Sequence, residues 1–595
     1  MIKHTFIYFS ILFFFIGFPV QTLIAQGALD EISVENQIEN SKLIIEGKVI
    51  AKESFWNDDY TNIFTKNTIE VYKIFKGENQ GQVEIITKGG WVGNLGEEVV
   101  PSLQLKINEV GVFMLYPSKT KLLNESSSLR KYNPYSGPQA FYKYDINFNK
   151  VNSIFKSYDD IEDNFYNTIT SKTKLSYTEI VKKSFSSKLN SRAASSKGLL
   201  AIAITGVSPS TITAGTKSVL IITGTDFGLT KGKVHFQDAD VQSGQIEALD
   251  SQIISWKDTE VQVEVPSDAG TGSIQVEDAG GVKSPFSNLA KITIPYAELN
   301  YGVGLSDYQS QHVERGIIGG MEWRMTTAFD ANTAAKESFL RAFESWSCTT
   351  GINWETGSTT PSNFTARNGT NIIRFANDGE MEAGVLAYCA TYPSSCTGIG
   401  IGGKTNVYVD ELDIVFAPES ERNWQYGPAL ATGGQTDFES VAIHELGHGH
   451  QLGHVISPGA IMHYSISNGQ NSRVLSQDDI DGGNDVQSRS TATSVCGQDI
   501  VTNQSCSLGV EDEILKDVIK IYPNPSNGKF YISNELNINL QKATVYDMSG
   551  RLISEFDLSG PSKEKSINLI GISKGIYLLN IYSDHAFVSK KLILE

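Results

Sequence analysis

Short runs in which apolar and polar residues alternate fill the first third of the chain. Residues 28–185 contain KLIIEGKVI (42–50), TIEVYKIFKG (68–77) and QVEIITKGG (82–90), separated by turn-forming residues. Alternation with a period of two between turn signals is typical of β-strands. We therefore predict a β-rich N-terminal module over 28–185, with one helix near 177–184 and no catalytic constellation. The serine-rich stretch 184–198 predicts a linker.

The β pattern continues over residues 200–296 with a different set of motifs. SPSTITAGT, a strand, GTDFG, SWKDTEVQVEVP and a closing TGSIQV strand follow one another. This order resembles the IPT/TIG family, and the resemblance implies an immunoglobulin-like β-sandwich. Such modules act as spacers or binding surfaces, so we assign no chemistry to this segment.

Residues 300–490 mix two periodicities. MEWRMTTAFD (321–330), NIIRFAND (371–378), GVLAYCATY (384–392) and ELDIVFAP (411–418) predict strands. KESFLRAFESW (336–346), TDFESVAIHELGHGHQ (436–451) and the segment that begins at LSQDDID (475–481) predict helices. Thr436 with Glu439, and Ser476 with Asp479, have the spacing of a capping box. Strands and helices in this order predict an α+β domain.

The last segment, 515–595, is again a small β block. IYPNPSNGKFYI, ATVYDMSGRLI, GISKGIYLLNI and VSKKLIL recur at short spacing. From YPNP (522–525) through KGIY (574–577) to Lys590 and Lys591, these blocks resemble the C-terminal sorting domain of type IX secretion cargo. The resemblance implies a β-sandwich that the type IX machinery recognises, and that is then removed or exchanged for a surface anchor.

The N-terminus has the pattern of an export signal. Lys3 precedes an apolar run from Phe6 to Val20, and Ala25 follows among small and polar residues. This pattern predicts a Sec signal peptide over 1–25. The alternative, a membrane anchor, needs about 20 apolar residues, and this run is shorter and contains Pro19. We expect a protein that crosses the inner membrane by the Sec route, then the outer membrane, and is secreted or anchored at the cell surface.

Length, charge and cysteine content narrow the possibilities further. A chain of 595 residues is long enough for about four domains. A net charge of -18 excludes a nucleic-acid partner, because phosphate binding needs a basic face. Export places the five cysteines in an oxidising compartment, where two disulfides can form and one thiol is left over. Proximity favours Cys496 with Cys506, and a pair among Cys348, Cys389 and Cys396. We expect a monomer.

Candidate chemistry is concentrated in HELGHGHQLGH, residues 444–454. On a helix His444 and His448 are four residues apart, so their imidazoles face one side and can share a Zn²⁺ ion. Glu445 is rotated by one residue, within reach of a metal-bound water, as a general base requires.

A third protein ligand is needed to leave one position on the metal for water. His450 lies about 200° around the helix from His448, so it has a packing or solvent-facing role. His454 reaches the metal if the chain turns between Gly449 and Gly453. We therefore predict His444, His448 and His454 as zinc ligands.

With these residues the segment resembles the metzincin metallopeptidases, and within them the matrixins. The family pattern HExxHxxGxxH is missed only at Gln451, where glycine normally allows a left-handed turn. Gly449 or Gly453 is an alternative place for that turn. Met462 stands where the family has its Met-turn, beneath the zinc site. MHY (462–464) resembles the astacin branch, which makes Tyr464 a candidate transition-state donor, with packing beneath the site as its other role.

The predicted function is a secreted zinc endopeptidase that hydrolyses peptide bonds in extracellular proteins, with Glu445 as general base on a zinc-bound water. A protein or peptide substrate would pair with the exposed edge strand near 384–392. The alternative is a surface adhesin or binding protein with an inactive metzincin fold. The acidic loop DGEME (378–382) also predicts a structural Ca²⁺ ion, although its spacing does not identify the ligands. No cysteine precedes Cys348 to hold the zinc in a latent form, so latency would need another ligand or steric cover from the 28–185 module.

Overall fold

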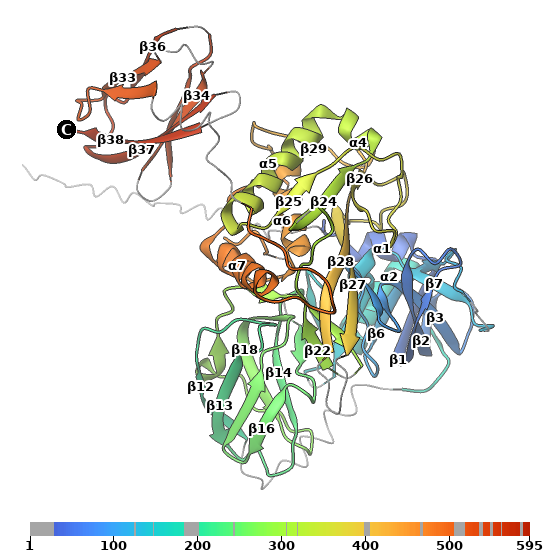
Figure 1. The fold of residues 1–595 in the computed structure, drawn as a ribbon. Helices are drawn as coiled ribbons and strands as arrows, with labels where there is room; N and C mark the ends of the chain where they lie inside the picture. The colour runs from blue at the N-terminus through green and yellow to red at the C-terminus, as the bar shows by residue number, and fades with distance from the viewer. Residues whose placement is uncertain are drawn as a thin grey trace, which may run out of the picture. The chain divides into compact units, whose positions relative to one another are not determined.

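The computed structural model is multidomain and rich in β-strands (Figure 1). It describes residues 29–595 except 124–126, 147, 184–201, 242–243, 305, 318, 398–404, 458, 464–467, 505–517, 535–539, 548–550, 561 and 584–586. The predicted signal peptide and the 184–198 linker lie outside the described residues. The chain divides into two compact units, Met1–Gln504 and Ser505–Glu595. No helix of the described part is long and apolar enough to cross a membrane.

The N-terminal module is built on a sheet that closes on itself. Strand β1 pairs with both β2 and β6, and the order continues through β3 and β7 back to β6. The three predicted strands are present as β1 (Leu43–Trp56), β2 (Ile63–Lys76) and β3 (Gln82–Lys88). The others are β6 (Val110–Pro117), β7 (Lys131–Pro134), β8 (Phe141–Asp145), β9 (Lys150–Asn152), β10 (Ser157–Asp159) and β11 (Thr178–Glu179).

Helices α1 (Val34–Asn40) and α2 (Tyr166–Thr173) pack on this sheet, and a π-helical turn, η2 (Ile161–Phe165), leads into α2. The helix predicted near 177–184 is wrong in position. The chain leaves the helical conformation at Lys174, which has a φ of 57°, and residues 178–179 pair with β2 as β11. Backbone pairing with an existing strand therefore outweighed the weak helical preference of that stretch.

Residues 203–292 form two four-stranded sheets that share one apolar core. The first contains β12 (Ala203–Ser208), β13 (Val219–Thr225), β17 (Glu260–Glu264) and β16 (Ile253–Lys257). The second contains β15 (Gln245–Glu247), β14 (Lys233–Asp238), β18 (Ala269–Glu277) and β19 (Lys291–Ile292). Alternate residues of β13 are buried and exposed, as the sequence pattern predicts for a strand with one face in a core.

The histidine motif lies in a mixed α/β arrangement. Its sheet contains β23 (Gly316–Ile317), β24 (Gly320–Met325), β25 (Trp354–Thr356), β26 (Asn371–Phe375), β27 (Ala387–Thr397) and β28 (Thr405–Phe416). Strands β24, β26 and β28 are parallel, and β27 runs antiparallel to β28. The helices are α4 (Thr327–Ala331), α5 (Thr333–Thr350), α6 (Phe438–Gly449) and α7 (Gln477–Ala492). Short pairs complete the domain: β20 (Ala297–Glu298) with β31 (Leu452–Gly453), β21 (Asn300–Val303) with β22 (Ser306–Gln309), and β29 (Trp424–Gln425) with β30 (Thr436–Asp437).

Two predicted helix starts have different outcomes. Helix α7 begins after Ser476, whose hydroxyl and Asp479 form the predicted capping box. Helix α6 is capped by Asp437 instead of Thr436, because the Asp437 carboxylate accepts from Ser440 N at 2.9 Å. Glu439 does not complete a box; its Oε2 accepts from Arg341 Nε at 2.8 Å. A carboxylate one residue later thus displaced the predicted threonine cap.

Two strands of the N-terminal module extend the sheet of the histidine domain. Strands β4 (Gly90–Val92) and β5 (Leu95–Val100) form a hairpin, and β5 pairs antiparallel with β27. The sheet order is therefore β23-β24-β26-β28-β27-β5-β4, so β27 is an internal strand.

The disulfide prediction is wrong in its pairing. Cys396 is bonded to Cys496, 100 residues away in sequence, with 5.8 Å between their Cα atoms. Cys496 is therefore not bonded to Cys506, which lies outside the described residues. Cys348 is also disulfide-bonded, and Cys389 is the buried free thiol among the described cysteines. Nearness in sequence failed here because β27 carries Cys396 to the segment that follows α7.

The C-terminal unit has two sheets around a separate core. One contains β32 (Ile519–Tyr522), β33 (Lys529–Asn534) and β36 (Glu564–Asn568). The other contains β35 (Leu552–Asp557), β34 (Leu540–Asp547), β37 (Gly575–Ser583) and β38 (Phe587–Leu594). Buried residues such as Phe530, Val545 and Leu579, drawn from both sheets, belong to one apolar cluster, which makes this unit a two-layered β domain.

Candidate metal centre

Helix α6 presents two histidines on one side of a fully buried helix. All twelve of its residues are buried, so the two histidines project into the interior of the domain and not into solvent. His444 and His448 lie one turn apart, and their Nε2 atoms are 3.1 Å from each other. The predicted spacing of four residues therefore produces the predicted juxtaposition.

Gln451 turns the chain after α6. Its φ is 71°, in the left-handed region, whereas neither Gly449 nor Gly453 has a positive φ. The residue that departs from the family pattern thus takes the turn itself, and the two alternative glycines do not. Its backbone N donates to His448 O at 2.9 Å. Its side chain is buried, and Oε1 accepts from the hydroxyls of Tyr301 at 2.6 Å and Ser310 at 2.8 Å.

This turn brings His454 back to the helix. The His454 Nε2 atom lies 3.1 Å from that of His448 and 3.3 Å from that of His444. A tetrahedral ion with Zn–N bonds of 2.0–2.1 Å holds its ligand atoms about 3.3–3.4 Å apart. The three nitrogens, at 3.1–3.3 Å from one another, therefore lie close to the separation that a tetrahedral zinc site needs. They form the one group of three or more potential metal-ligating side chains found among the described residues.

The other nitrogen of each ring determines the tautomer. His444 Nδ1 lies 2.8 Å from Ile461 O, and His448 Nδ1 lies 2.9 Å from Leu452 O. A carbonyl oxygen only accepts, so in both rings Nδ1 carries the hydrogen and donates it. Nε2 is then left with a lone pair directed at the other rings, so these close Nε2 pairs are not hydrogen bonds. Converging lone pairs in a buried place fit a bound cation.

Glu445 lies beside these histidines with its carboxylate buried. Neither of its oxygens has a hydrogen-bond partner among the described protein groups. Burial raises the pKa of Glu445 well above its usual range. Burying a carboxylate without a hydrogen-bond partner costs folding free energy. Carboxylates with pKa values perturbed in this way are common in active sites. Burial also raises the pKa of the Cys389 thiol on β27, and the Glu445 carboxylate raises it further.

Met462 and His450 take the supporting positions. A Cβ built on Gly447 would lie 2.2 Å from Met462 Sδ, so the sulfur packs directly against α6 where the helix lacks a side chain. His450 is buried on the other side, where its Nε2 lies 2.9 Å from Thr350 Oγ1 and its ring contacts Trp346. Of the two roles predicted for His450, it has the packing one. Burial lowers the pKa of His450 to about 3. Tyr464 lies outside the described residues.

The predicted exposed edge strand is already paired. On β27, Cys389 lies opposite Val100 of β5 and Ser394 lies opposite Leu95. Ahead of β27, Asp30 N donates to Gly384 O at 2.7 Å. Residues 384–392 therefore lie beneath the N-terminal module, and the prediction of an exposed edge was wrong. The sequence could not show this, because backbone pairing requires no characteristic side chain.

Two other polar features have different explanations. In the DGEME loop, Arg374 pairs with Glu380, and Asn377 N donates to Glu380 at 2.9 Å, so protein groups occupy this carboxylate. Calcium stays a prediction.

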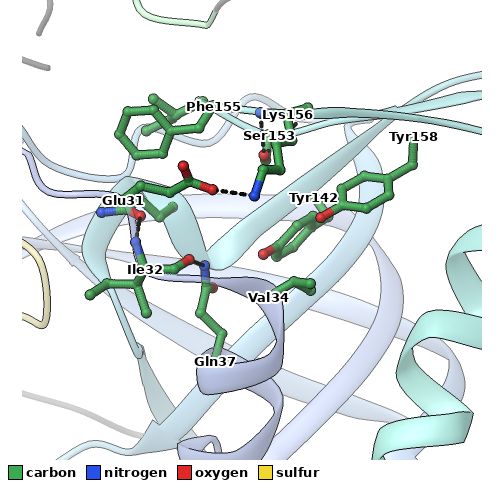
Figure 2. A pocket seen from close by; sticks show the side chains of 11 residues that line it. Glu31, Ile32, Val34, Gln37, Tyr142, Ser153, Phe155, Lys156 and Tyr158 are labelled. Carbon is green, nitrogen blue, oxygen red and sulfur yellow. Dashed lines mark hydrogen bonds and ion pairs between the residues drawn. The ribbon is translucent and has the colours of Figure 1, made fainter. Parts of the chain in front are cut away.

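A small pocket in the N-terminal module is lined by residues such as Tyr142 and Phe155 (Figure 2). Its Glu31 and Lys156 are paired with each other at 2.6 Å, so it offers no unpaired base.

Comparison with known families follows the same division of the chain. Residues 321–486 match the family model described as Matrixin. This segment is similar to the matrixins. Residues 203–294 match the IPT/TIG domain, and residues 520–595 match the secretion system C-terminal sorting domain. The matrixin match supports a metallopeptidase, and the sorting domain supports export by type IX secretion to the cell surface or beyond.

One curated relative supports the matrixin assignment. The chain is 30% identical over 167 residues to Metalloendoproteinase 2-MMP of Arabidopsis thaliana, which is 27% of this chain and 39% of that protein. Two similar solved structures have low TM-scores. A γ-CGTase from alkalophilic Bacillus clarkii covers 62% of this chain and 42% of its own at 9% identity and a TM-score of 0.14. A biofilm associated protein BSP domain covers 93% and 95% at 8% identity and a TM-score of 0.11. At these TM-scores neither likeness indicates a shared fold.

Proposed function

We propose that the chain is an exported zinc-dependent endopeptidase that hydrolyses peptide bonds in extracellular proteins. The observation that carries the proposal is the convergence of three imidazole Nε2 atoms, 3.1–3.3 Å apart, beside the unpaired buried carboxylate of Glu445. His444, His448 and His454 would hold the ion. When bound there, zinc supplies a Lewis acid that polarises a peptide carbonyl and lowers the pKa of water.

Glu445 performs the proton transfers in this proposal. As the attacking water adds to the peptide carbon, the Glu445 carboxylate takes its proton. The same group then gives that proton to the leaving amine nitrogen as the peptide bond breaks. Among the described residues its oxygens have no hydrogen-bond partner, which supports this role because no hydrogen bond has to be broken first. Tyr464 remains a candidate donor to the developing oxyanion.

The N-terminal module would keep this enzyme latent by occupying the place of the substrate. An extended peptide binds a strand edge through backbone hydrogen bonds, and β5 already makes this pairing with β27. Val100 of β5 lies opposite Cys389 of β27 and Val99 lies opposite Ala390, so β5 occupies the backbone groups with which a substrate strand would pair. Substrate would therefore enter only after the β4–β5 hairpin has left.

The experiment uses the full chain with a recognition sequence for a site-specific protease inserted between Arg192 and Ala193. After cleavage and removal of the N-terminal fragment, we expect about one zinc per chain, casein hydrolysis, and loss of hydrolysis with a chelator. Glu445→Ala should retain zinc and lose several orders of magnitude in turnover. Zinc binding without hydrolysis in the released parent would favour the other candidate function, a surface binding protein. Absence of zinc would reject the metal site itself.

A further inference from the structure

A loop of the TIG domain lies against His454. The loop follows β14, and Asp240 Oδ1 lies 2.5 Å from His454 Nδ1. The His454 side chain is 11% exposed and that of Asp240 is 51% exposed. A carboxylate oxygen accepts, so Nδ1 of His454 donates and its Nε2 lone pair is turned toward His444 and His448. A residue 214 positions away in sequence thus orients the third histidine.

The Asp240 loop is itself held in place by the TIG fold. Asp240 N donates to Asp238 Oδ1 at 2.9 Å. Ala239 N donates to Asp268 O at 2.9 Å, next to the point where Asp238 of β14 lies opposite Ala269 of β18. The carboxylate is therefore presented by two paired strands and not by a free surface loop.

The TIG domain and the strand that follows it also contact the chain on both sides of His454. Ala297 of β20 pairs with Gly453 of β31, immediately before the histidine. After it, Ile456 packs so closely on Gly270 that a Cβ built there would lie 2.6 Å from Ile456 Cδ1. The position of His454 is therefore set by contacts with this neighbouring domain.

The three histidines differ in what orients them. For His444 and His448 the acceptors are the backbone carbonyls of Ile461 and Leu452. A backbone acceptor is available whatever the side chain, whereas the acceptor for His454 depends on the single residue Asp240. A carboxylate also makes the histidine a better ligand than a carbonyl does, because its charge stabilises the N–H donor.

From these contacts we propose that Asp240 is a positioning residue for the zinc site, which makes the TIG domain part of the metal centre. The inference rests on the proposed zinc-binding function. It changes the role expected for this domain, which the sequence suggested to be a spacer or a binding surface. No local pattern in the sequence around Asp240 signals this role, because the contact exists only after two domains have packed together.

The test measures zinc affinity of the metal-free full-length chain by competition with a chromophoric chelator, so it does not depend on activity. Asp240→Ala should raise the Kd for zinc about tenfold, the lower end of the usual effect of removing such a partner. Asp240→Asn keeps an acceptor oxygen without the charge and should give an intermediate Kd. Asp250→Asn is the matched control, because Asp250 is an exposed TIG acid, paired with Lys231, and should leave the Kd unchanged.

Cobalt provides a second readout that overall stability does not affect. The visible absorption of Co²⁺ in the parent should change in position or intensity in Asp240→Ala, since the third ring is no longer held by its Nδ1. A Kd within twofold of the parent for both Asp240 variants would overturn the inference, as would an equal weakening in Asp250→Asn. If Asp240→Ala fails to fold, Asp240→Asn with a parental Kd and cobalt spectrum overturns it alone. A parent that binds no zinc would instead reject the proposed function.

Discussion

The Tyr301 hydroxyl donates a 2.6 Å hydrogen bond to Oε1 of Gln451, the residue whose φ of 71° turns the chain from α6 toward His454. A left-handed conformation costs a residue with a side chain about 1–2 kcal/mol. Glycine avoids that cost but has no side chain to bind. Here the buried amide oxygen also accepts from Ser310, so the hydrogen bonds offset the backbone cost.

Substitutions at Gln451 separate these two contributions. Gln451→Ala keeps the backbone cost and leaves two buried hydroxyls without their acceptor, so we expect it to lose about 2–3 kcal/mol in unfolding free energy. Gln451→Gly loses the same hydrogen bonds but gains about 1 kcal/mol from its permitted φ. Urea unfolding of the metal-free chain measures both. Equal losses in the two variants would contradict the backbone argument, and a parental value for the alanine variant would contradict the hydrogen-bond argument.

Releasing the β4–β5 hairpin should activate the enzyme without cleavage. Val99 is buried in an apolar cluster with Tyr388, Ala390 and Tyr392 of β27. Val99→Asp places a charge there, which costs several kcal/mol unless the hairpin leaves. We expect at least a tenfold higher initial rate of casein hydrolysis from the uncleaved chain. Asn94→Asp adds the same charge at an exposed position of the same hairpin and should stay latent. Equal rates for Val99→Asp and the parent would argue against latency through β5.

Because Met462 packs against α6 at Gly447, we expect alanine to reduce stability and zinc affinity more at Gly447 than at Gly449 of the same helix. Gly447→Ala would place its Cβ 2.2 Å from Met462 Sδ and 3.1 Å from the Trp346 ring. Overpacking of this kind costs about 1–3 kcal/mol and should also weaken zinc binding, because Met462 has to move. Gly449→Ala is the control, since its Cβ would find its nearest neighbour at 3.6 Å. Thermal unfolding and zinc competition measure the stability and zinc affinity of the two variants. Equal values for Gly447→Ala and Gly449→Ala would show that Met462 is not tightly packed against Gly447.

Docking of the N-terminal module should weaken as the pH rises. Burial, together with the nearby Asp268 carboxylate, raises the pKa of Glu98 on β5 from 4.5 to about 8. A raised acid favours the docked state fully below its free pKa, and this contribution is lost as the pH rises toward and through about 8. Size-exclusion chromatography of the chain cleaved between Arg192 and Ala193 should show the module retained at pH 5 and lost at pH 8.5.

Glu98→Gln tests the cause of that pH dependence. The amide resembles the protonated acid and cannot ionise, so the cleaved variant should keep its N-terminal module at pH 8.5. Dissociation of the variant over the same pH range as the parent would show that another group controls docking.

Local geometry explains what the sequence by itself determined. The pairing of His444 with His448 follows from 3.6 residues per helical turn, and Glu445 follows from its place beside His444. Ser476 with Asp479 set the start of α7, and alternation along β13 set which residues face its core. Each of these signals is contained within a few residues, because backbone geometry alone fixes the relation between neighbours.

Only the tertiary structure decided the rest. Gln451 holds the turn toward His454 because Tyr301, 150 positions away, supplies its hydrogen bond. The Asp240 carboxylate reaches His454 because two domains pack together, and β5 covers β27 because an unpaired strand edge accepts any backbone of suitable register. Hydrogen bonds and strand pairings between distant segments form only when the intervening chain closes into a loop. Loop closure produces no periodic pattern of apolar and polar residues, so the sequence does not predict it.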